Sequence, residues 1–69
     1  MERGFIMKVI AKDDIGYPEY PYLNWKKDQE YDCWENNHIL HIVDEKGVRF
    51  NFTGKARIRL PEVFEFIDE

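Results

Sequence analysis

The sequence predicts an all-β fold, a small antiparallel barrel of five to six short strands. Several short runs alternate between apolar and polar residues, which is the pattern of a strand with one buried face. Clusters of Asp, Asn, Gly and Pro interrupt these runs about every eight to twelve residues, as turns do in small β proteins. No segment shows sustained helical spacing. A barrel is expected because closure of the sheet removes exposed strand edges.

The first half of the chain contributes three expected strands. Residues 5–12 form the first, which is rich in Ile, Val, Met and Phe, and the acidic turn at 13–16 ends it. Residues 29–35 form the second strand. A turn at Asn36-Asn37 then leads into the third strand, at 38–43.

The second half opens with the clearest hairpin signal in the sequence, Asp44-Glu45-Lys46-Gly47. Gly47 can adopt the positive φ angle that closes such a short loop. Three further strands are expected, at 48–53, 56–60 and 64–67. A turn at 53–55 separates the first two of them, and Pro61 ends the second because proline cannot donate a hydrogen bond to a sheet.

One domain spanning residues 1–69 is expected, because a chain of 69 residues holds a single core. Its aromatic content of 16% suits a small core, since each buried aromatic side chain removes a large apolar area from water. The alternation of apolar residues predicts these core positions: Val9, Ala11, Tyr31, Cys33, Leu40, Ile42, Val48, Phe50, Phe52, Ile58, Leu60 and Phe66.

Residues 1–6 are expected to be a disordered or non-native N-terminal extension. Met7-Lys8 resembles a natural start, and Glu2-Arg3-Gly4 can be encoded by purine-rich codons that resemble a bacterial ribosome-binding site. Met7 and Met1 are therefore both candidate starts, and the sequence leaves the choice between them open.

Composition predicts a cytoplasmic protein. No apolar run approaches the roughly 20 residues of a membrane-spanning helix, and Cys33 is the only cysteine, which favours a reducing compartment. The net charge of −4 disfavours non-specific binding to nucleic acid, which requires a positive surface, and favours a protein partner.

Four short motifs along the chain support a family resemblance. Met7-Lys8-Val9-Ile10-Ala11 opens the first strand, Lys27-Asp28-Gln29-Glu30-Tyr31 leads into the second, Asp44 to Gly47 forms a tight hairpin, and Phe64-Glu65-Phe66-Ile67 closes the chain. With these motifs, residues 7–67 resemble the small SH3-like barrel proteins of phages, prophages and mobile elements of Gram-positive bacteria. Two features depart from that pattern: Lys27-Asp28 replaces the usual Gly-Lys, and residues 53–61 form a longer stretch than expected. The resemblance implies an SH3-like barrel.

The most informative segment for function is Tyr17 to Trp25, which holds four aromatic residues and two prolines where a polar loop would be usual. Rigid aromatic side chains are typical of binding surfaces, and in SH3 domains tyrosines in this loop line a groove for proline-rich peptides. Tyr17, Tyr20, Tyr22 and Trp25 are therefore the candidate partner-binding residues. The alternative is that they form a hydrophobic lid over one end of the barrel.

A second candidate surface is basic. Arg49, Lys55, Arg57 and Arg59 are expected to form a stripe on one sheet face, where a small barrel can bind nucleic acid. The alternative is a solvated face on which these residues pair with neighbouring acids.

Other polar residues do not form a catalytic or metal-binding pattern. His38 and His41 are three apart, and residues at that spacing on a strand point to opposite faces, so one metal ion is not expected to bind both. Cys33 is expected to be buried and unreactive. Asp13-Asp14 has the character of a turn. No enzyme activity, metal or cofactor is expected.

These features together predict a non-enzymatic protein-binding module. The family resemblance adds the expectation that it modulates a host protein, including one of a defence system. Nucleic-acid binding through the basic residues is the alternative function, and a second copy of the chain is a further candidate partner.

Overall fold

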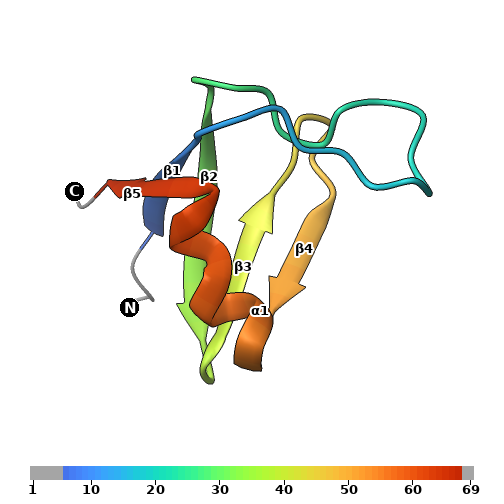
Figure 1. Cartoon of the computed structure of the whole chain (residues 1–69). Helices are drawn as coiled ribbons and strands as arrows, with labels where there is room; N and C mark the ends of the chain where they lie inside the picture. Colours follow the sequence, from blue (N-terminus) through green and yellow to red (C-terminus); the bar gives the residue numbers. More distant parts are fainter. Residues whose placement is uncertain (1–5, 68–69) are drawn as a thin grey trace.

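A computed structural model describes residues 6–67, which form a single five-stranded antiparallel sheet (Figure 1). The strands are β1 (Ile6–Ala11), β2 (Glu30–Asn36), β3 (Ile39–Val43), β4 (Arg49–Phe52) and β5 (Phe64–Ile67). Their order across the sheet is β4-β3-β2-β1-β5. The all-β fold class is confirmed. The edge strands are β4 and β5, and within the described residues no strand ladder joins them, so a closed barrel is not shown.

The tight turns explain how consecutive strands pair. Asn37 and His38 have φ angles of 53° and 66°, which is the geometry of a two-residue hairpin turn between β2 and β3. The expected turn at Asn36-Asn37 is therefore wrong by one residue, and His38 belongs to the turn rather than to a strand. The hairpin at residues 44–47 is confirmed: Gly47 has a φ angle of 86°, and its N–H donates to the Asp44 carbonyl at 3.0 Å.

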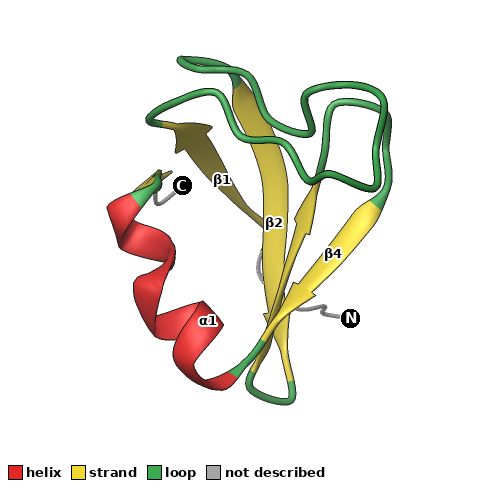
Figure 2. Ribbon diagram, turned by 45° about the vertical axis from the view of Figure 1, so that its right-hand side comes forward, coloured by secondary structure: helices red, strands yellow, loops and turns green. Residues whose placement is uncertain are grey.

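The expected strand at 56–60 is wrong, because a short α1 helix (Gly54–Arg59) occupies this segment and continues into the 3₁₀ helix η1 (Leu60–Glu62). Lys, Ala and Arg are good helix formers, and over so few residues their alternation with apolar residues fits a helical turn as well as a strand. Pro61 is tolerated in the first turn of η1, where its missing N–H costs little. Figure 2 shows α1 beside the sheet, in the connection that carries the chain from β4 to β5.

The core lies on the inner face of the sheet and is closed by the segment between β1 and β2. Eight of the expected core residues are buried, seven from the strands and one from η1: Val9, Ala11, Tyr31, Cys33, Leu40, Ile42, Phe52 and Leu60. Phe50 and Phe66 are partly buried and pack against it. Val48 and Ile58 are exposed at 37% and 74%, so their expected burial is wrong. Trp25 and Phe64 take the remaining core positions.

The N-terminal expectation is only partly covered by the described residues. Ile6, which the sequence placed in an extension, is the first residue of β1 and pairs with Trp34. Residues 1–5 lie outside the described residues. Among residues 6–67, neither helix has the length and apolar character that crossing a membrane requires.

Candidate functional site

The aromatic segment, residues 17–25, lies in the long connection between β1 and β2. Its two ends are tied together, because the N–H of Ile15 donates to the Trp25 carbonyl at 2.8 Å and the N–H of Trp25 donates to the Ile15 carbonyl at 3.0 Å. In Figure 1 the connection extends beyond the strands and runs alongside the turn between β3 and β4. The segment is therefore a closed loop that is held against a second loop.

Trp25 is the core anchor of this segment. Its side chain is only 1% exposed, and its ring lies 5.0 Å from that of Phe50 and 5.3 Å from that of Phe64. The indole Nε1–H donates to the Val43 carbonyl at 3.1 Å, so its polar group is also satisfied inside. Trp25 is therefore a core residue, as the lid interpretation describes, and its side chain presents almost no surface to a partner.

Tyr17 and Tyr20 are partly exposed, and their rings pack against β4. The Tyr17 ring stacks on Phe50 at 5.3 Å, and the Tyr20 ring meets Phe50 edge-on at 5.5 Å and Tyr22 edge-on at 5.7 Å. Partial burial raises the pKa of Tyr17, with a smaller contribution from nearby Glu19. Each ring therefore covers the core on one side and offers its other side to solvent.

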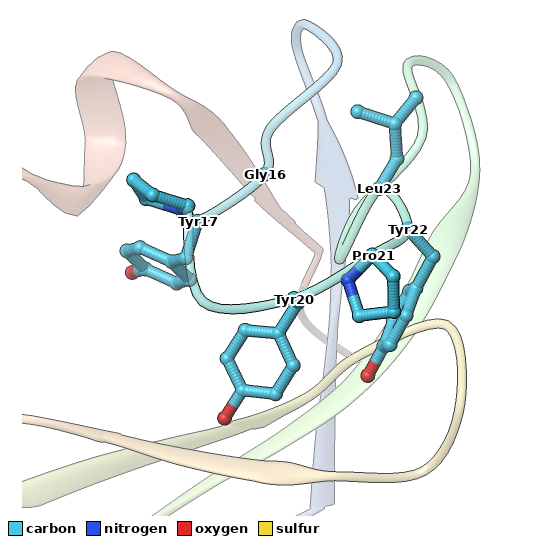
Figure 3. Close-up of a pocket in the computed structure, with 7 residues that line it drawn as sticks. Gly16, Tyr17, Tyr20, Pro21, Tyr22 and Leu23 are labelled. Atoms are coloured by element: carbon cyan, nitrogen blue, oxygen red, sulfur yellow. The ribbon is translucent and has the colours of Figure 1, made fainter.

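An open hollow of about 740 Å³ lies along the aromatic segment. Its lining residues are Gly16, Tyr17, Pro18, Tyr20, Pro21, Tyr22 and Leu23. Figure 3 shows the three tyrosine rings extending from one side of the segment, while Leu23 points to the opposite side. Leu23 is 41% exposed. The lining contains no charged side chain, so the hollow offers apolar area and phenol hydroxyls.

A buried carboxylate, Asp44, fixes this segment to the hairpin between β3 and β4. Asp44 is 4% exposed. Its Oδ2 accepts hydrogen bonds from the Tyr22 hydroxyl at 2.8 Å and from the Asn24 Nδ2 at 2.9 Å. Its Oδ1 accepts from the backbone N–H groups of Lys46 and Val48 at 2.9 and 2.8 Å. One carboxylate therefore bonds to both loops at once.

Asn24 extends this network along the segment. Its side chain is fully buried, its Oδ1 accepts from the Tyr17 N–H at 2.9 Å, and its carbonyl accepts from the Glu45 N–H at 2.7 Å. The sequence analysis did not identify Asn24 or Asp44 as part of the site. The only sequence signal was a polar residue inside an aromatic run and an aspartate opening a hairpin, and both patterns are common in ordinary turns.

The electrostatics of this network follow from the hydrogen bonds. Burial alone would raise the pKa of Asp44, but the hydrogen bonds from Asn24, Tyr22, Val48 and Lys46 outweigh it and hold the pKa below its usual value. Partial burial of its ring and the bond to Asp44 raise the pKa of Tyr22 to about 12. The Lys46 Nζ lies 5.4 Å from the centre of the Tyr22 ring, a cation–π distance.

The basic residues do not form the expected stripe on one sheet face. Lys55, Arg57 and Arg59 lie on α1 rather than on a strand, and only Arg49 is on the sheet. Arg57 Nη2 is 2.7 Å from Glu35 Oε2, and Arg59 Nη2 is 3.6 Å from Glu62 Oε1. Two of the four cations are therefore paired with acids of this chain. The Nε of Arg57 is buried and has no hydrogen-bond partner among the described residues.

The other polar candidates are separated by the fold. Cys33 is buried on the inner face, and burial raises the pKa of its thiol to about 11. His41 stacks on Trp34 at 5.3 Å, and its Nδ1 is 2.6 Å from the Asn51 Oδ1. Asp14 accepts from the Lys27 N–H at 2.9 Å, as a turn residue does. Within residues 6–67, no group of three or more His, Cys, Asp or Glu side chains has metal-binding geometry.

Comparisons with protein-family models, with curated proteins and with solved structures found no match to this chain. What the site can do therefore follows from its own residues. Aromatic and proline side chains supply apolar area at low entropic cost, and phenol hydroxyls supply hydrogen bonds. This combination suits recognition of another surface.

Proposed function

We propose that this protein is a non-enzymatic protein-binding module whose contact surface is the hollow lined by residues 16–18 and 20–23. The observation that carries the proposal is that Tyr17, Tyr20 and Tyr22 stay partly exposed although Phe50 and Trp25 beneath them already close the core. A lid needs only the buried side of these rings. Their exposed sides, together with two prolines, form a rigid apolar surface of the kind that protein partners bind.

The proposed occupant is an extended apolar segment of a partner protein. An extended segment fits an open hollow along a loop, and an uncharged lining favours an uncharged ligand because burying an unpaired charge is costly. Phenol hydroxyls can donate to the carbonyl groups that such a segment presents. The resemblance to proteins of phages and mobile elements extends the proposal: the partner would be a host protein whose activity this chain modulates.

Selection of peptides from a random display library on the wild-type protein tests the proposal. A selected peptide is expected to shift the NMR resonances of residues 17–23. Its affinity should fall at least about tenfold in Tyr20→Ala, since truncating a tyrosine at an interface hot spot costs about 2 kcal/mol or more. Ile58→Ala is the matched control, because Ile58 is exposed on α1, away from this segment. Peptides that shift only other residues would contradict the proposal.

Two other classes of ligand are outcomes of the same experiment. A second copy of the chain would broaden the resonances of residues 17–23 as the protein concentration rises. Binding of nucleic acid would instead shift the resonances of Arg49, Lys55 and Arg59, and the affinity for nucleic acid would fall steeply as the salt concentration rises. Either result, without a peptide that binds at the aromatic segment, would replace the proposed function.

A further inference from the structure

The three tyrosines of the hollow differ in what their hydroxyl groups do. The Tyr22 hydroxyl donates to the Asp44 carboxylate at 2.8 Å. Within residues 6–67, the hydroxyls of Tyr17 and Tyr20 have no hydrogen-bond partner, although both rings are held by ring contacts. Figure 3 shows the Tyr20 hydroxyl extending away from the segment and the Tyr22 hydroxyl ending beside the neighbouring hairpin.

Asp44 is the group that creates this difference. Both of its oxygens are occupied, each by two donors, so it has no capacity left for a ligand. Two of the four donors belong to the aromatic segment and two to the hairpin between β3 and β4. A buried carboxylate is costly unless hydrogen-bond donors compensate its charge. Asp44 therefore stabilises the arrangement of the two loops in which all four donors reach it.

We infer that Asp44 is the positioning residue of the aromatic surface. Its hydrogen bond with the Tyr22 hydroxyl fixes the aromatic segment in place, while the hydroxyls of Tyr17 and Tyr20 are available to bind a partner. Asp44 itself touches no ligand. Its effect on binding is indirect: a segment already held in its binding shape loses less conformational entropy when the partner arrives. This inference rests on the proposed function for its second half only.

Asp44→Asn is the most informative variant because it is nearly isosteric. The Asn oxygen can still accept from the N–H groups of Lys46 and Val48, which keeps the hairpin. Its amide nitrogen then faces the Nδ2 of Asn24, and two donors cannot bond to each other. The hairpin should therefore survive while the aromatic segment is released.

Amide hydrogen exchange in the unliganded protein measures the release of the aromatic segment. In Asp44→Asn, the Tyr17 N–H, which donates to Asn24, is expected to exchange at least about tenfold faster, since a hydrogen bond to a charged group contributes more than 1.4 kcal/mol. The ring contact between Tyr20 and Tyr22 should disappear from the NOE spectrum. The amides of β2 should keep their protection. Glu65→Gln, which removes an exposed carboxylate on β5, is the matched control.

The division among the tyrosines is tested with single-hydroxyl deletions and a library-selected peptide. Tyr20→Phe should leave the exchange rate of the Tyr17 amide unchanged. It should lower the affinity for the peptide by about two- to tenfold, which is the range for loss of one neutral hydrogen bond. Tyr22→Phe should raise the exchange rate of the Tyr17 amide before any peptide is added. It should also lower the affinity for the peptide, because the aromatic segment is then less ordered. Equal behaviour of the two variants in the unliganded protein would overturn the division.

The outcomes separate this inference from the proposed function. Unchanged Tyr17 exchange in both Asp44→Asn and Tyr22→Phe would overturn the role of Asp44, whether or not a peptide binds. If Asp44→Asn unfolds completely, Tyr22→Phe decides, because it removes one donor and keeps the charge. If no selected peptide binds the wild-type surface, the proposed function and the role of the Tyr17 and Tyr20 hydroxyls fail, while the exchange data still decide the role of Asp44.

Discussion

The rings of Trp25 and Phe64 meet edge to face, with their centres 5.3 Å apart and their planes at 89°. Trp25 comes from the aromatic segment and Phe64 from β5, so this contact joins a loop to an edge strand through the core. Both side chains are almost fully buried. The aromatic segment is therefore part of the fold as well as the candidate binding surface, and its residues divide between these two roles.

That division predicts unequal losses of stability. Trp25→Ala should lower the free energy of unfolding by about 3–5 kcal/mol, because it empties a core position. Tyr20→Ala should cost only about 1–2 kcal/mol, since this ring is partly exposed and contributes edge contacts. Urea denaturation followed by circular dichroism measures both. Equal losses would show that Tyr20 is a core residue and would remove it as a contact residue.

The α1 helix predicts opposite consequences for two residues that the sequence placed together in a strand. Ile58→Ala should change the free energy of unfolding by no more than about 0.5 kcal/mol, because Ile58 is 74% exposed. Leu60→Ala should cost about 2–5 kcal/mol, because Leu60 is buried in η1. Thermal and urea unfolding of the two variants give the comparison. A loss in Ile58→Ala as large as that in Leu60→Ala would favour the strand.

Asp44 predicts an acid-dependent part of the stability. Its pKa in the folded protein lies below the ordinary value of 3.8, so the unfolded chain takes up the proton first. The stabilisation from Asp44 should be fully present above about pH 4–5 and lost as the pH falls through the folded-state pKa. The difference in unfolding free energy between wild type and Asp44→Asn, measured by urea denaturation, should therefore shrink towards pH 2. A difference that stays constant with pH would contradict this role.

The buried thiol of Cys33 should react with alkylating reagents only after the protein unfolds around it. Burial raises its pKa to about 11 from an ordinary value of 9.0, which alone lowers the thiolate fraction at pH 8 about a hundredfold. Alkylation by iodoacetamide at pH 8 should be slower than in urea-unfolded protein by at least this factor, as followed by mass spectrometry. Comparable rates in the two states would place Cys33 at an accessible position.

Local patterns in the sequence were sufficient for most of the sheet. The alternation in residues 29–35 and 38–43 predicted β2 and β3 to within a residue or two at each end, because a half-buried strand requires period-2 alternation. The hairpin at 44–47 followed from one glycine whose φ angle had to be positive. The same reasoning failed at 56–60, where six residues of α1 are too few to distinguish a helical period from an alternating one.

The division of the aromatic segment was decided only by the tertiary structure. The sequence identified Tyr17 to Trp25 as the unusual segment and left open whether its rings form a lid or a surface. Trp25 is buried because it fills the space between β4 and β5, and Tyr22 is oriented by Asp44, a residue 22 positions away. Such long-range contacts have no local sequence pattern. The composition of the segment was therefore set by sequence alone, while the exposure of each ring depended on what the rest of the chain placed beneath it.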